Sequence, residues 1–131
     1  MSMSLAQKLA ADSIAAVAEG RNLQDVLAQI RAAHPELTAQ ENGALQDIAY
    51  GCQRYLGSLK HMLAQMLKKP IDNPQLESLL LAAMYQLHYT RNAPHAVVNE
   101  AVESIAKIGR GQYRSFANAI LRRFLRERDK L

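Results

Sequence analysis

Apolar side chains recur along this chain at intervals of three and four residues, which is the spacing of one face of an α-helix. No segment shows the strict alternation of apolar and polar residues that is typical of a half-buried β-strand. The pattern predicts an all-α fold, a compact bundle of about seven helices joined by short connections. The clearest stripe lies near the end of the chain, and we expect its members to face the core: Tyr113, Phe116, Ala117, Ile120, Leu121, Phe124 and Leu125.

Residues that cap helices mark several of the predicted boundaries. Gly20 suits the left-handed position after a helix, so it ends a first helix over about residues 4–19. Asn22 is a favourable cap for the second helix. Thr38 and Glu41 have the spacing of a capping box, in which each side chain accepts a hydrogen bond from the other residue's backbone amide. A third helix is therefore expected to begin just after Thr38.

The apolar series over residues 45–66 is long for a single helix of a globular protein. We expect two helices there, or one helix with a kink near Gly57. An asparagine cap and Pro74 start the next helix, which is apolar around much of its circumference and should lie at the centre of the fold. Another helix begins at Pro94 and is ended by Gly109.

The length of 131 residues suits one domain with a single core. Cys52 is the only cysteine, which excludes an internal disulfide and suits a reducing compartment. The first nine residues lack the cationic flank and apolar run of a signal peptide, and no apolar stretch has the length of a membrane span. We therefore expect a cytoplasmic protein with no membrane contact.

Basic residues concentrate in the second half of the chain, although the net charge is only +4. Residues 67–131 carry eleven Lys and Arg against six Asp and Glu, whereas residues 1–66 carry five against six. This asymmetry is typical of a protein with a polyanionic partner such as RNA. A solvated helix end with no partner remains the alternative.

The last predicted helix presents arginines opposite its apolar stripe, and guanidinium groups suit phosphate oxygens and stacked bases. The neighbouring helix and the turn between them add further basic residues. Helices joined by so short a turn usually pack antiparallel, which would gather these charges into one patch. The candidate RNA-binding residues are Lys107, Arg110, Arg114, Arg122, Arg123 and Arg126.

The sequence offers little for catalysis, cofactor binding or metal binding, and we predict no residues for any of them. Cys52 falls in an apolar stripe and is expected to be a buried, unreactive thiol. Glu100 and Glu103 stand one turn apart, where two solvated glutamates near a helix start are a simpler explanation than an acid–base pair. The turn at 109–111 is too short for a phosphate loop; it either redirects the chain or holds one phosphate. No two histidines have the spacing of a metal site among His34, His61, His88 and His95.

Two stretches of the chain, residues 85–102 and 115–124, resemble the NusB family. The most recognisable parts are the N-E-A element at 99–101 and the F-x-N-x-(aliphatic)-L element at 116–121. The resemblance implies an all-α bundle that binds RNA and protein. It also suggests that Glu100 and Asn118 help to join two helices by polar contacts.

Within this family the chain is most similar to the N-terminal domain of the RsmB (Sun/Fmu) methyltransferases, which make 5-methylcytosine in 16S rRNA. The similar segments are E-G-R-N-L-Q-D-V-L at 19–27, Y-T-R-x-x-P-H-A at 89–96 and L-R-R-F-L-R-E-R at 121–128. The resemblance implies that residues 1–131 are a single RNA-binding accessory domain whose partner is 16S rRNA. The catalytic domain, which would bind S-adenosylmethionine and pack against this one, is not present in the sequence, so no cofactor is expected here.

Two other functions stay open. Free-standing NusB proteins, which act in transcription antitermination with RNA and a ribosomal protein, typically carry an arginine-rich first helix that contacts boxA RNA. In this chain the first helix, over residues 5–19, has Lys8 as its only base, which favours the methyltransferase branch. A helical protein-interaction module whose basic end only aids solubility is the third possibility.

Overall fold

The computed structural model describes residues 3–131. These residues form seven α-helices and a final 3-10 turn, with no strand among them, so the predicted all-α fold is confirmed. The elements are α1 (Met3–Ala18), α2 (Leu23–Ala33), α3 (Ala39–Arg54), α4 (Leu56–Gln65), α5 (Pro74–Tyr89), α6 (Pro94–Ala106), α7 (Arg114–Glu127) and η1 (Arg128–Lys130). Within residues 3–131 no helix has both the length and the apolar character that a membrane crossing requires.

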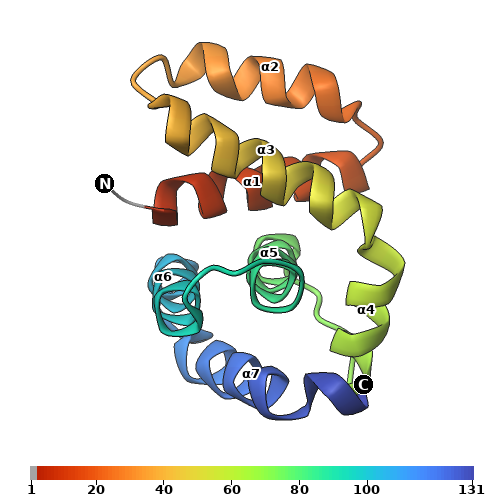
Figure 1. Ribbon diagram of the computed structural model, residues 1–131. Helices are drawn as coiled ribbons and strands as arrows, with labels where there is room; N and C mark the ends of the chain where they lie inside the picture. The colour runs from red at the N-terminus through yellow and green to blue at the C-terminus, as the bar shows by residue number, and fades with distance from the viewer. Residues whose placement is uncertain (1–2) are drawn as a thin grey trace.

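Helix α5 is the centre of the bundle, as its sequence predicts. Figure 1 shows it nearly end-on beside α6, with α1 and α3 on one side, α7 on the other and α4 at its flank. Every residue from Ser78 to Leu87 is buried, because neighbours cover α5 around its whole circumference. Helix α2 packs on the outside of α1, at the opposite end of the molecule from α7.

The predicted caps form where the sequence places them. Thr38 Oγ1 accepts a hydrogen bond from the Glu41 amide at 3.0 Å, and Glu41 Oε1 accepts one from the Thr38 amide at 2.9 Å. Asn22 and Asn73 each accept a hydrogen bond from the backbone amide three residues on, at 3.1 and 3.0 Å. Gly20 follows α1 with a φ of +99°, a left-handed conformation that glycine adopts without strain. The starts of α2, α3 and α5 and the end of α1 are therefore encoded by residues close to them in the sequence.

The long apolar series forms two helices, as expected, but the break falls at Tyr55 and not at Gly57. The Tyr55 ring stacks on the ring of Tyr89 in α5, with centroids 4.0 Å apart and planes inclined by 7°. Gly57 lies inside the first turn of α4 with helical hydrogen bonding around it. The position of the break thus coincides with a contact to α5, and no local residue pattern marks it.

The stripe on α7 packs inward with one exception. Ala117, Ile120, Leu121 and Phe124 are buried, and Tyr113 and Leu125 pack partly buried against the core. The prediction that Phe116 faces the core is wrong, because 37% of its surface is exposed. Phe116 faces the connection between α4 and α5, and no helix of the described chain packs over it. A groove remains between this connection and the start of α7.

Helix α7 lies below α5 and α6 in Figure 1 and runs back along them. Its start lines a groove with Leu76 at the beginning of α5, its end contacts His88, and the η1 turn that follows lies beside Pro94, the first residue of α6. The turn that redirects the chain contains Gly109 and Gly111, with φ values of +60° and +80°. Both values are in the left-handed region that favours glycine. Helices α6 and α7 therefore run in opposite overall directions, as the short turn between them leads one to expect.

Candidate nucleic-acid interface

Three of the candidate RNA-binding residues surround the turn between α6 and α7. Lys107 is the C-cap of α6, Arg110 lies in the turn, and Arg114 is the first residue of α7. All three side chains are exposed, and none takes part in an ion pair within residues 3–131. We call these three residues the basic turn. Its charges are available to an anionic partner, since no carboxylate of the described chain neutralises them.

The other three candidates lie farther along α7 and differ in their surroundings. Arg126 is exposed, but Arg122 and Arg123 are half-buried. Arg122 Nε donates a hydrogen bond to Asn118 Oδ1 at 3.2 Å. Arg123 Nε pairs with Glu127 Oε2 at 3.1 Å, and its Nη1 donates to the carbonyl oxygen of Met66 at 3.3 Å. Arg123 therefore joins α7 to the end of α4, which is a structural role.

The six residues do not form one compact patch. Arg126 lies twelve positions after Arg114, which corresponds to about 18 Å along a helix axis. The basic turn lies at one end of α7, and Arg126 lies at the other. A polyanion that touches both ends must follow the helix, as an extended RNA strand does.

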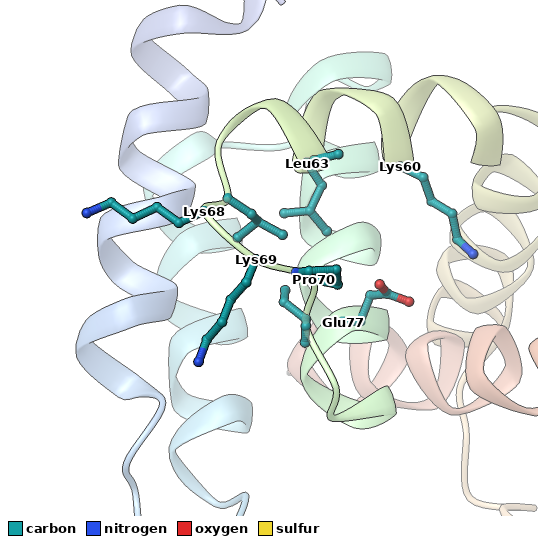
Figure 2. Close-up of a pocket in the computed structure, with 9 residues that line it drawn as sticks. Lys60, Leu63, Lys68, Lys69, Pro70 and Glu77 are labelled. Atoms are coloured by element: carbon teal, nitrogen blue, oxygen red, sulfur yellow. The ribbon is translucent and has the colours of Figure 1, made fainter.

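Sequence reasoning did not include two lysines that the fold brings to this region. Lys68 and Lys69 belong to the connection between α4 and α5, and together with Tyr113 and Phe116 they line a groove of about 440 Å³. A second hollow of about 230 Å³ lies on the other side of the same connection (Figure 2). In that view Lys60 and Glu77 lie on one side of the hollow, whereas Lys68 and Lys69 extend away from it. The only sequence signal for these lysines is the excess of basic residues after position 66.

Within residues 3–131 no group of three or more His, Cys, Asp or Glu side chains is placed to hold a metal ion. Cys52 is fully buried, and its Sγ lies 3.7 Å from the carbonyl oxygen of Leu81. Burial raises the pKa of the Cys52 thiol, and the charge of Asp47 raises it further. A thiol in this state is a poor nucleophile, which confirms the prediction of a buried, unreactive cysteine.

Glu100 and Glu103 differ, although the sequence predicts two solvated carboxylates. Glu103 is exposed, but Glu100 is half-buried and accepts a hydrogen bond from the backbone amide of Ser4 in the first turn of α1. Burial raises the pKa of Glu100, the Ser4 amide opposes the rise, and the charge of Glu103 adds to it. Glu100 thus joins α6 to α1, as the resemblance suggests. The hydrogen bond of Asn118 stays within α7.

Comparison with known proteins gives a consistent result. The NusB family model matches residues 4–126 of this chain. Three similar relatives are each named ribosomal RNA small subunit methyltransferase B. The protein of Pectobacterium carotovorum is 34% identical over 124 residues, that of Cronobacter sakazakii 32% over 128, and that of Escherichia coli 30% over 128. The matches cover 91–95% of this chain but only 29% of each relative, so the chain spans less than a third of their length.

Proposed function

The chain belongs to the NusB family, and on that basis we propose that it is the RNA-binding accessory domain of a 16S rRNA 5-methylcytosine methyltransferase. Its partner is 16S rRNA, and it is not catalytic by itself. S-adenosylmethionine belongs to a separate catalytic domain, against which this domain packs in the cytoplasm. The name of the similar relatives supports ribosomal RNA as the partner and methylation as the reaction of the whole enzyme.

The observation that carries the proposal is the basic turn together with Arg126. Their cations are exposed and unneutralised within the described residues and lie at the two ends of α7, and Lys68 and Lys69 add charge beside its first turn. Cations of this kind supply most of the affinity of a protein for a nucleic acid, because they release the counterions of the phosphates. The half-buried Arg122 and Arg123 contribute less, since part of their hydrogen-bonding capacity is already used.

The antitermination function has weaker support. Lys8 is the only base of α1, and its Nζ lies 3.1 Å from the carboxylate of Asp12. Within its described residues, Met3–Ala18, the first helix therefore presents no unpaired cation to RNA. The similar relatives also carry a methyltransferase name.

The test compares two double charge reversals. Arg110→Glu with Arg114→Glu alters the basic turn. Arg21→Glu with Arg31→Glu alters two exposed arginines, one just before α2 and one in its last turn, far from α7 (Figure 1). Each pair lowers the net charge from +4 to 0, so the pairs are matched in total charge. Binding to 16S rRNA fragments is measured by fluorescence anisotropy at several salt concentrations.

We expect wild type to contact roughly four phosphates, which gives a slope of log affinity against log salt of about −3 to −4. The basic-turn variant should bind more weakly, with a slope smaller by about 2, since each lost phosphate contact removes about 1. The α2 variant should bind almost as wild type does. Equal losses in the two variants would mean that only net charge matters, and absence of salt-dependent binding by wild type would refute RNA binding.

A further inference from the structure

A small cleft at the corner between α3 and α4 is not used by the proposed interface. It has a volume of about 300 Å³ and is lined by four of the five tyrosines of the chain, Tyr50, Tyr55, Tyr85 and Tyr89, with Asp47 and Arg54 beside them. We call it the tyrosine cleft. A cavity of this size is at the lower end of the range for small-ligand sites and holds a single planar group such as a nucleobase.

Three of these tyrosines, Tyr55, Tyr85 and Tyr89, form an ordered stack. Tyr55 and Tyr89 are nearly parallel at 4.0 Å, and Tyr85 lies 5.7 Å from Tyr89 with an interplanar angle of 24°. Gly51 makes room for this arrangement, because a Cβ atom there would lie 2.1 Å from the Tyr85 ring. Tyr85 Oη donates a hydrogen bond to Asp47 Oδ1 at 2.8 Å, which holds that carboxylate at the cleft.

Tyr50 is the part of the cleft that internal packing does not explain. Its side chain is 45% exposed, and only Tyr50 and Phe116 are large exposed hydrophobic residues among residues 3–131. Asp47, Tyr50 and Arg54 are spaced by three and four residues, so they share one face of α3. A tyrosine ring exposed in this way is available for stacking with a flat ligand.

The charged groups of the cleft are also partly free. Asp47 Oδ2 makes no hydrogen bond within the described residues, although Oδ1 is engaged by Tyr85. The Arg54 guanidinium lies 5.5 Å from the centre of the Tyr55 ring and forms no ion pair with any residue from 3 to 131. Stacking on the ring orients the guanidinium and leaves its N–H groups for an anion.

We propose that the tyrosine cleft binds one unpaired nucleobase of single-stranded RNA, which stacks on Tyr50, and that the adjoining phosphate pairs with Arg54. Asp47 Oδ2 then accepts a hydrogen bond from an amino group of the base. Cytosine carries such a group at N4, whereas uracil has a carbonyl oxygen at the same position, so the cleft prefers cytosine to uracil. The inference rests on the proposed RNA-binding function and adds a base-selective site to it.

The lining favours a base over a protein side chain. The cleft is lined by aromatic rings with one acceptor and one cation at its edge, so it offers both a stacking surface and polar groups that match a base and its phosphate. Aromatic stacking together with an edge acceptor and a phosphate-binding arginine is the usual arrangement for recognition of unpaired RNA bases.

The experiment uses two labelled six-nucleotide RNAs, one of cytidine and one of uridine, and measures their binding to the 131-residue chain by anisotropy. Tyr50→Ala should weaken binding of the cytidine oligomer by about 5- to 150-fold, the range for loss of one base stack. His95→Ala is the control, since it removes an exposed aromatic ring on α6 that lies outside both the cleft and the groove beside α7. Circular dichroism melting shows that each variant is folded.

A second variant tests the selectivity. Wild type should bind the cytidine oligomer at least about 5-fold more tightly than the uridine oligomer, as expected for one specific hydrogen bond to a base. Asp47→Asn keeps an oxygen to accept the Tyr85 hydroxyl but offers an amide donor to the base, so this preference should disappear or reverse.

The outcomes separate the two proposals. If Tyr50→Ala has no effect, or no more effect than His95→Ala, the tyrosine cleft is not a base site even though the basic turn binds RNA. If Arg110→Glu with Arg114→Glu leaves the binding of 16S rRNA fragments unchanged while Tyr50→Ala abolishes oligomer binding, the interface on α7 is refuted and the cleft stands. If wild type binds neither oligomer, the cleft proposal is overturned.

Discussion

The two phenylalanines of this chain lie on the same helix in opposite environments, which makes them a matched pair for a stability experiment. Phe124 is completely buried in α7, and its ring meets the edge of the His88 ring with centroids 5.9 Å apart. Phe116 is eight residues earlier on the same helix and is 37% exposed. Replacement of each by alanine removes the same atoms at two different depths.

The expected losses follow from these environments. Burial of a phenylalanine side chain is worth about 1.5–3 kcal/mol, and the contact with His88 adds about 0.5–1.5 kcal/mol. The cavity left in the core increases the cost, so Phe124→Ala should lower the free energy of unfolding by about 3–5 kcal/mol. That is a large share of the roughly 5–15 kcal/mol that holds a domain folded. Phe116→Ala should cost less than about 1 kcal/mol, close to the range of surface substitutions.

Urea unfolding followed by circular dichroism measures both values, provided that the dependence on urea concentration is the same in the variants and wild type. For a domain of this size the melting temperature of the Phe124 variant should fall by roughly 10–20 °C. Equal losses in the two variants would show that Phe116 is packed in the core after all. A loss below about 1 kcal/mol for Phe124→Ala would mean that the buried face of α7 is assigned incorrectly.

Two other substitutions test contacts between helices. Gly51→Ala should destabilise the fold by about 1–3 kcal/mol, because the new Cβ would overlap the Tyr85 ring. Gly43→Ala in the same helix meets nothing within 4 Å and should stabilise the fold by up to about 1 kcal/mol. Chemical unfolding measures both changes, and a stabilising Gly51→Ala with a destabilising Gly43→Ala would contradict the structure. The raised pKa of Glu100 means that the folded state holds its proton to higher pH than the unfolded state, so its contribution to stability falls as the pH rises from about 4.5, its ordinary value, through the raised pKa. Glu100→Gln should therefore lose less stability than wild type over that interval, and parallel curves of melting temperature against pH would refute this.

The local features of the fold were predictable from the sequence because each depends on a few adjacent residues. The capping box at Thr38 and Glu41, the asparagine cap before Pro74 and the left-handed Gly20 all form as predicted. The burial of α5 was also predictable, because a helix that is apolar on all sides has to be surrounded by others. The buried thiol of Cys52 follows from the same periodicity.

Only the tertiary structure determined which contacts α7 makes with other parts of the chain, because these contacts depend on how the helices cross. Periodicity places Phe116 on the apolar side of α7, but the segment opposite it is a connection that leaves a groove, so the ring stays exposed. The same crossing brings Arg123 against the carbonyl of Met66 and places Lys68 and Lys69 beside α7. These outcomes join residues from distant parts of the chain, and a pattern of spacing within one helix carries no information about which neighbour will cover it. The tyrosine cleft is of this kind too, because α3, the break at Tyr55 and α5 build it only when they pack together.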